Sequence, residues 1–121
     1  MKSISMAVVG CGDIAHIRYL YAISHRKEKF QIDAVYDRNP EVCQRTAKEL
    51  GAQAENSLES LLAIAKIDTV IVTTYHPSHA SIAIQCMEAG KNVIVEKPFA
   101  TSSADAQKVL ETAKRTGKLC M

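Results

Sequence analysis

Short apolar runs alternate along the chain with segments in which apolar residues recur at helical spacing. The runs are continuous, a pattern typical of strands that are covered on both faces of a sheet. The helical spacing between them predicts crossover helices. The runs predict five strands, at Ile4–Val9, Ile32–Asp37, a short edge strand at Gln53–Glu55, Thr69–Val72 and Asn92–Glu96.

Capping residues indicate where the predicted helices begin and end. A side chain that accepts hydrogen bonds from free helix amides precedes three of them, at Asn39, Ser57 and Ser102. A glycine ends three helices, and these glycines are Gly51, Gly90 and Gly117. In the first helix the apolar residues at helical spacing are Ile14, Ile17 and Tyr21.

Strand–helix alternation of this kind implies right-handed crossovers and parallel strands. We therefore predict an α/β fold, a Rossmann-type doubly wound parallel sheet in three α/β/α layers. Leu119–Met121 resembles a sixth strand that begins and is truncated. The length of 121 residues predicts one domain, residues 1–121.

Composition narrows the classes of function. The chain is 47% hydrophobic and 23% charged, ordinary values for a soluble globular domain. A net charge of +2, without clustered basic residues beyond a solvated run at 25–29, argues against nucleic-acid binding. No apolar run is long enough for a membrane span, and we expect the segment before the glycine turn to be too short for a signal peptide. The four cysteines are widely spaced and predict reduced, mostly buried thiols and a cytoplasmic protein.

A glycine turn joins the first predicted strand to the first helix, with the sequence Gly10-Cys11-Gly12-Asp13-Ile14-Ala15. This is the context that the G-x-G-x-x-A dinucleotide fingerprint requires. The first glycine permits the tight turn, the second lets the backbone approach a pyrophosphate, and Ala15 lets the helix pack closely on the sheet. The helix N-terminus supplies free N–H groups to the phosphates. We expect Gly10, Gly12, Asp13 and Ile14 to bind the cofactor.

An acidic residue supports this interpretation. Asp37 closes the second predicted strand, where a carboxylate that holds the adenosine ribose hydroxyls is expected. The alternative is that Asp37 only caps the turn before Asn39. Asp37 repels a 2′-phosphate and favours NAD, whereas the adjacent Arg38 could hold that phosphate and admit NADP. NAD is the predicted cofactor, with NADP possible, and Cys11 is expected to fill a small gap rather than to act in redox chemistry.

Two further segments resemble one family. The segment 67–80, which contains Thr73-Thr74-Tyr75-His76-Pro77-Ser78-His79, looks like its fourth strand and the loop that follows. The segment 87–98 ends in Glu96-Lys97-Pro98 and looks like its E-K-P strand. With the glycine turn, these resemble the Gfo/Idh/MocA oxidoreductases, the glucose–fructose oxidoreductase and inositol dehydrogenase group, over essentially the whole chain.

The resemblance implies roles for matching residues. It places Thr73 and Thr74 against the cofactor, and the loop from Tyr75 to His79 near the nicotinamide ribose. Glu96 would face the cofactor, and Lys97 would reach toward the nicotinamide and the substrate hydroxyl as the catalytic residue. One departure is that Tyr75 stands where the family often has a proline, which bears on the conformation of that loop.

Chemistry supports Lys97 independently. Ligands of open α/β sheets bind at the carboxyl ends of strands, and Lys97 directly follows such a strand. An ammonium beside an oxidised, positively charged nicotinamide gives up its proton more readily, which suits exchange with a substrate hydroxyl. The alternative is an ordinary exposed lysine at a strand end. His76 and His79 have the H-x-x-H spacing of metal ligands, but Pro77 interrupts any helix there and no third ligand is near, so we expect no metal.

The family also implies what lies outside this chain. Its dehydrogenases have a second, C-terminal domain, which supplies most of the substrate pocket and the usual oligomer interface. We expect this chain to bind dinucleotide weakly and to be inactive alone, as part of a homo-oligomeric NAD(P)-dependent dehydrogenase. The expected substrate is a secondary alcohol of a sugar, cyclitol or similar polyol. The rival hypothesis is a non-enzymatic dinucleotide sensor or regulatory protein of the same fold.

Overall fold

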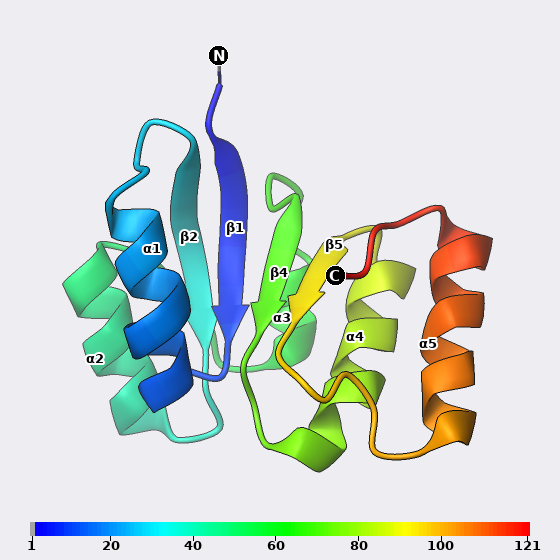
Figure 1. Cartoon of the computed structure of the whole chain (residues 1–121). Coiled ribbons are helices and arrows are strands. Elements are labelled where there is room, and N and C mark those ends of the chain that lie inside the picture. Colours follow the sequence, from blue (N-terminus) through cyan, green and yellow to red (C-terminus); the bar gives the residue numbers. More distant parts are fainter. Residues whose placement is uncertain (1) are drawn as a thin grey trace.

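The computed structural model of the protein describes residues 2–121. Five parallel strands form one sheet in the order β3-β2-β1-β4-β5. Figure 1 shows β2, β1, β4 and β5 side by side. The chain therefore leaves β1 toward one edge of the sheet and later returns to β4 on the other side of β1. The strands are β1 (Ile4–Val9), β2 (Phe30–Tyr36), β3 (Gln53–Ala54), β4 (Thr69–Val72) and β5 (Asn92–Val95).

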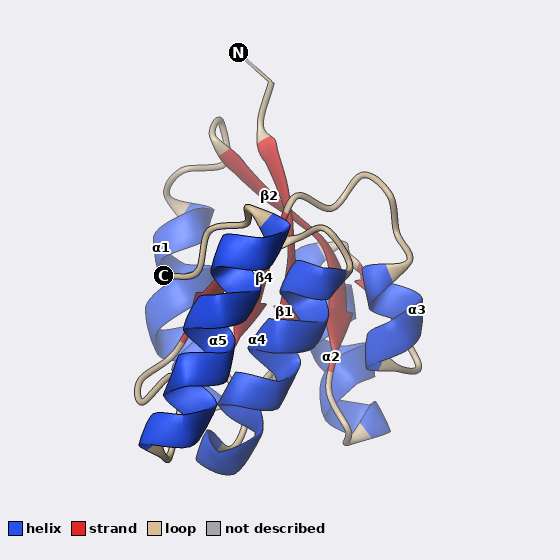
Figure 2. Cartoon of the chain, turned by 90° about the vertical axis from the view of Figure 1, so that its right-hand side faces the viewer, coloured by secondary structure: helices blue, strands red, loops and turns tan. Residues whose placement is uncertain are grey.

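Helices cover both faces of the sheet, which confirms the three-layer, doubly wound fold. The first helical segment and α2 pack on one face, and α3, α4 and α5 pack on the other. Figure 2 shows α5 beside α4 in front of the sheet. The helical elements are η1 (Ala15–Leu20), α1 (Tyr21–Ser24), α2 (Pro40–Leu50), α3 (Leu58–Leu62), η2 (His76–Ser78), α4 (His79–Glu88) and α5 (Ser103–Thr116).

The central strands are buried on both faces, as their continuous apolar runs predict. Successive side chains of β1 enter opposite cores, because strand side chains alternate between faces. Ala7 and Val9 pack under α3 and α4, whereas Met6 and Val8 pack under the first helix and α2. All four residues of β4 are buried.

All but one of the predicted caps are confirmed. The Asn39 side chain accepts hydrogen bonds from the first amides of α2, and Ser57 and Ser102 do the same for α3 and α5. Helices α2 and α5 end at Gly51 and Gly117, whereas the cap of α4 is Ala89, one residue before the predicted Gly90. The caps satisfy backbone donors that would otherwise lack partners at the helix ends.

The apolar stripe of the first helix faces solvent. Ile14, Ile17 and Tyr21 are 41%, 69% and 66% exposed, and the residues buried against the sheet are Ala15 and Leu20. The segment contains a six-residue π-helix, η1, inside an otherwise α-helical stretch. The wider turn of a π-helix changes which residues share a face, so α-helical spacing does not identify the buried side here.

Strand ends differ slightly from the predicted bounds. Asp37 and Glu96 lie one residue beyond β2 and β5, in the loops at the carboxyl edge of the sheet. The predicted sixth strand begins beside β5, where Cys120 forms a single parallel bridge with Val93 and the Met121 amide donates to the carbonyl of Val93. The bridge extends the sheet beyond β5. The loops that carry Asp37 and Glu96 both lie at the carboxyl edge of the sheet.

Candidate functional site

The glycine turn after β1 is held by the strands on both sides of it. The amide of Gly10 donates to the Tyr36 carbonyl over 2.9 Å, at the end of β2. From the other side, the Thr73 hydroxyl donates to the Gly10 carbonyl over 2.6 Å, and the Thr73 amide donates to the Val9 carbonyl over 2.9 Å. The turn is therefore fixed at the point where the strand order reverses, which is where open α/β sheets bind ligands.

The two glycines of the turn do different work. Gly10 has a φ of +93°, and a Cβ there would lie 2.6 Å from the Thr73 carbonyl oxygen. Gly10 is therefore required by the fold of the turn itself. A Cβ on Gly12 would meet nothing within 4 Å, so its lack of a side chain leaves open space over the turn. That space is what the close approach of a pyrophosphate needs.

The helix that follows presents its N-terminus to this space. Asp13 and Ile14 are exposed at its start, and Ile14 makes no side-chain capping hydrogen bond. Backbone amides without an intrahelical partner, together with the partial positive charge of the helix end, attract phosphate oxygens. The residues present therefore fit the pyrophosphate of a dinucleotide.

Asp37 is fastened at both carboxylate oxygens. Its Oδ2 accepts a hydrogen bond from the Cys11 amide over 2.8 Å, and its Oδ1 accepts one from the Asn39 amide over 2.8 Å. Asp37 thus caps the turn before Asn39, as the alternative interpretation expects, and its carboxylate also joins the glycine turn to the end of β2. Each oxygen keeps a lone pair, so the carboxylate can still accept hydrogen bonds from ribose hydroxyls.

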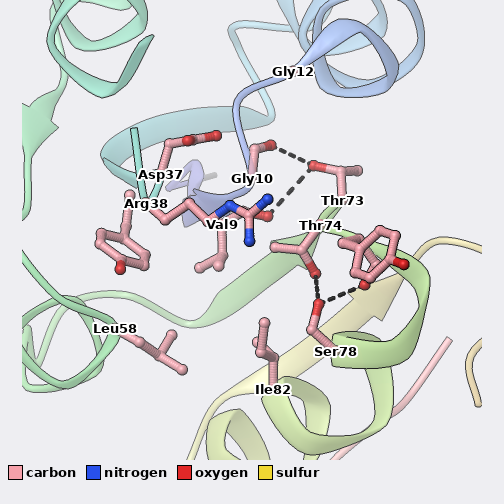
Figure 3. A pocket seen from close by; sticks show the side chains of 12 residues that line it. Val9, Gly10, Gly12, Asp37, Arg38, Leu58, Thr73, Thr74, Ser78 and Ile82 are labelled. Atoms are coloured by element: carbon pink, nitrogen blue, oxygen red, sulfur yellow. Dashed lines mark hydrogen bonds between the residues drawn. The ribbon is translucent and has the colours of Figure 1, made fainter. Parts of the chain in front are cut away.

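These loops enclose a cleft of about 360 Å³ between the carboxyl ends of β1, β2 and β4 (Figure 3). The side chain of Arg38 extends into the cleft beside Asp37. Seven of the predicted cofactor residues line the cleft, and these are Gly10, Gly12, Asp37, Arg38, Thr73, Thr74 and Tyr75. The cleft therefore brings together residues from three separate loops of the sequence.

The cleft also has lining residues that sequence reasoning missed. Leu58 of α3 and Ile82 of α4 contribute apolar side chains opposite the glycine turn. Helical spacing assigns Leu58 to an apolar stripe and leaves Ile82 out of one, and it does not tell which residues of a helix reach a cleft. Ser78 is a third such residue, and its hydroxyl lies 2.6 Å from that of Thr74. Val9 and Tyr36 complete the lining.

His79 lies behind the cleft and does not line it. Its side chain is fully buried, with Nε2 2.8 Å from the Thr74 carbonyl oxygen and Nδ1 2.8 Å from the Pro98 carbonyl oxygen. The ring therefore ties the loop after β4 to the loop after β5. Tyr75, which replaces the proline common in the family, is 72% exposed.

Glu96 and Lys97 stand outside the cleft, on the other side of the β4 loop. The two carboxylate oxygens of Glu96 accept hydrogen bonds from the Tyr19 hydroxyl and from the Lys97 amide, each over 3.0 Å. The Lys97 amide is the main cause of a lowered pKa for Glu96, which burial opposes and Tyr19 supports. Lys97 itself is exposed and borders an apolar hollow beside Phe99.

Two other candidate chemistries find no support in the site. Burial, reinforced by the charge of Asp37, raises the pKa of the Cys11 thiol to about 12, so this cysteine is held as an unreactive thiol. Among residues 2–121, no group of three or more His, Cys, Asp or Glu side chains could hold a metal ion. The rings of His76 and His79 pack 5.5 Å apart.

Among residues 2–121, no helix has the length and apolar character needed to cross a membrane.

The fold, the glycine turn and the anchored carboxylate together define a dinucleotide-binding Rossmann domain. Comparison with known proteins identifies the family. Residues 4–121 match the model of the Gfo/Idh/MocA oxidoreductases, described as an oxidoreductase family with an NAD-binding Rossmann fold, and the chain belongs to that family.

Relatives of this chain include enzymes of known activity. The inositol 2-dehydrogenase/D-chiro-inositol 3-dehydrogenase of Halalkalibacterium halodurans is 30% identical over 96% of this chain and 34% of its own length. The WlbA dehydrogenase of Chromobacterium violaceum, solved with NADH and UDP-GlcNAcA, superposes with a TM-score of 0.96 at 31% identity, over 100% of this chain and 35% of its own.

A third relative was solved with the other cofactor. The 3-ketoreductase KijD10 of Actinomadura kijaniata, in complex with NADP, gives a TM-score of 0.92 at 28% identity, over 99% of this chain and 38% of its own. The chain thus spans about a third of the length of these relatives.

Proposed function

We propose that this chain is the cofactor-binding part of an enzyme that transfers hydride between a nicotinamide dinucleotide and a secondary alcohol of a sugar, cyclitol or similar polyol. The observation that carries the proposal is the Asp37 carboxylate, which the glycine turn itself holds in place at the cleft. The inositol dehydrogenase and the sugar-nucleotide enzymes among its relatives support the substrate class.

The preferred cofactor in this proposal is NAD. Asp37 bears a negative charge next to the position expected for the adenosine ribose, where a 2′-phosphate would be repelled. Arg38 extends into the same cleft and could offset part of that repulsion. Because the carboxylate is anchored by two backbone amides and the exposed arginine is not, we give Asp37 the larger influence.

Lys97 is the proposed proton-transfer residue. When bound, the nicotinamide ring supplies the hydride acceptor. As the carbon–hydrogen bond of the alcohol breaks, the hydroxyl must lose its proton, and the neutral amine of Lys97 would accept it. Glu96 holds the Lys97 amide, which fixes the start of the side chain, while the amino group at its end remains free to reach a substrate.

The substrate pocket is proposed to come from a second domain, as the length of the relatives suggests. In this proposal the chain alone binds dinucleotide weakly and does not turn over an alcohol, and the complete enzyme is a homo-oligomer. Lys97 would then face substrate across the boundary between the two domains.

The test is activity of the chain expressed together with the segment that follows it in its gene, across a panel of polyols and sugars with NAD and NADP. We expect activity with at least one secondary alcohol, and we expect Lys97→Ala to abolish it. The control is Lys27→Ala, which changes another exposed lysine, far from Lys97 in the sequence, and should retain activity. Activity that survives Lys97→Ala removes this lysine from the mechanism.

The position of Lys97 outside the cleft keeps a second function open, a dinucleotide sensor without catalysis. Saturable NAD binding, combined with no turnover of any alcohol in the panel, would favour the sensor.

A further inference from the structure

A hydrogen bond joins the phosphate-binding helix to the Glu96-Lys97 turn. Tyr19, on η1, donates its hydroxyl proton to Oε2 of Glu96 over 3.0 Å. The two residues lie 77 positions apart in the sequence, so this contact links two elements that the chain does not connect locally. The ring of Tyr19 is partly buried among the apolar residues beneath the first helix, which holds its hydroxyl in place.

The second oxygen of the same carboxylate completes the link. Oε1 of Glu96 accepts a hydrogen bond from the backbone amide of Lys97 over 3.0 Å. Glu96 therefore has one partner on each oxygen, Tyr19 on one side and the lysine backbone on the other. The Glu96 amide also donates to the Val72 carbonyl over 2.9 Å, so the backbone of this residue is fixed to β4.

The protonation states suit this arrangement. Burial is the first cause of a raised pKa for the Tyr19 phenol, and its hydrogen bond to Glu96 is the second. The pKa of Glu96 is lowered, first by the Lys97 amide. Near neutral pH, therefore, a phenol that keeps its proton faces a carboxylate that has lost its own, and charge-assisted hydrogen bonds of this kind are among the stronger ones.

We propose that Tyr19 is a positioning residue that acts through Glu96: its hydroxyl ties the helix that receives the pyrophosphate to the turn that carries Lys97. The inference rests on the proposed role of Lys97 in proton transfer. The hydroxyl of Tyr19 is engaged by Glu96 and Tyr19 does not line the cleft, so we place its effect on the lysine turn. A shift of the cofactor helix would reach Lys97 along this path.

The structure offers a matched control. Tyr21 lies on the same helical segment and is 66% exposed, and among the hydrogen bonds of residues 2–121 its hydroxyl makes none. Tyr19→Phe and Tyr21→Phe each remove one hydroxyl group and keep the ring. A role for Tyr19 in packing alone would survive its replacement by Phe.

The first experiment reads the link without catalysis. The Lys97 amide resonance and its hydrogen-exchange rate are measured by NMR in the isotope-labelled 121-residue chain and its variants. We expect Tyr19→Phe and Glu96→Gln to shift this resonance and to speed its exchange, and Tyr21→Phe to leave both unchanged. An unaltered Lys97 amide in Tyr19→Phe would overturn the proposal.

The second experiment uses the chain with the segment that follows it in its gene. We expect Tyr19→Phe to lower kcat roughly tenfold, the scale of one lost hydrogen bond to a charged group, with KM for NAD within about twofold of the unaltered protein. The Tyr19 hydroxyl helps to lower the pKa of Glu96, so its loss should raise the pH at which Glu96 takes up a proton and loosens its hold on the Lys97 amide. The acid limb of the kcat profile should move to higher pH with it. Adding Tyr19→Phe to Glu96→Gln should cost little more, because the two residues act as one unit.

The outcomes separate this inference from the function on which it rests. One outcome is that Lys97→Ala abolishes activity while Tyr19→Phe changes neither kcat nor the pH profile. That outcome overturns the Tyr19 proposal alone. Additive losses in Tyr19→Phe and Glu96→Gln also overturn it. Activity that survives Lys97→Ala contradicts the proposed function, and the role of Tyr19 in proton transfer is contradicted with it.

Discussion

The amide of Cys11 donates a 2.8 Å hydrogen bond to Oδ2 of Asp37 and so fastens the glycine turn after β1 to the end of β2. The carboxylate is thereby part of the turn as well as part of the site. A second amide, from Asn39, holds its other oxygen. Side-chain orientation at this position is therefore set before any ligand binds, which lowers the cost of ordering the site on binding.

Removal of the Asp37 carboxylate should change cofactor choice. In Asp37→Ala we expect NAD binding to weaken roughly tenfold or more, since a hydrogen bond to a charged group is worth about 1.5–3 kcal/mol. The preference for NAD over NADP should also shrink, because the charge that repels a 2′-phosphate is gone. Calorimetric titration with both dinucleotides measures the two effects. Arg38→Ala is the control, expected to weaken NADP and to leave NAD within about twofold; an unchanged NAD/NADP ratio in Asp37→Ala would contradict this role.

The two glycines of the turn should respond differently to the same substitution. Gly10→Ala places a Cβ 2.6 Å from the Thr73 carbonyl oxygen at a φ of +93°, so it should destabilise the fold by at least about 1–3 kcal/mol, the cost of backbone strain alone. Gly12→Ala meets no atom within 4 Å and should keep its unfolding midpoint while losing NAD affinity. Urea denaturation and NAD titration of both variants test this. A stable Gly10→Ala protein would show that the Thr73 contact does not constrain the turn.

The order of strands and helices could be predicted from the sequence because each element carries its own local signal. Continuous apolar runs identify buried strands, and Asn39, Ser57 and Ser102 mark helix starts. The glycine turn and Asp37 were also predictable, since both follow strands at fixed spacing.

Three features could not be predicted, because each depends on the packing of distant segments. The π-helical turn of η1 moved Ile17 and Tyr21 to the surface and buried Leu20 instead. The contribution of Leu58 to the cleft depends on where α3 packs against the sheet. The Tyr19–Glu96 bond joins residues that no local pattern relates.

His79 should stabilise the two functional loops from behind. Each ring nitrogen of His79 lies 2.8 Å from one carbonyl oxygen, Nε2 from that of Thr74 and Nδ1 from that of Pro98. In His79→Leu these carbonyls lose their partner, and we expect the free energy of unfolding to fall by about 2–4 kcal/mol. Urea denaturation measures the change, with the exposed His76→Leu as the control. Equal free energies of unfolding for the two variants would contradict a stabilising role of His79 at both loops.

A carboxylate at the opposite edge of the sheet should make stability depend on acid. Burial alone would raise the pKa of Asp33, but the hydroxyl of Ser5, the ammonium of Lys66 at 3.0 Å and the amide of Gln31 lower it below the usual 3.8. The folded state therefore favours the ionised form. This contribution is complete above pH 3.8 and is lost as the pH falls below it, through the lower folded value.

The variant Asp33→Asn should remove that part of the acid dependence. We expect its unfolding midpoint to fall less steeply than that of the unaltered protein as the pH drops below 3.8. Thermal melts of the two proteins across this pH range make the comparison. Parallel curves for the two proteins would show that Asp33 has the same pKa folded and unfolded.

The central claim is that the cleft between Gly10 and Asp37 binds a nicotinamide dinucleotide. Titration of NAD and of NADP into the 121-residue chain by calorimetry tests it most directly, with Gly12→Ala as the matched variant. We predict saturable heat with a stoichiometry of one, stronger for NAD than for NADP and lost in Gly12→Ala. No saturable heat with either dinucleotide, from a chain shown to be folded, would contradict the account.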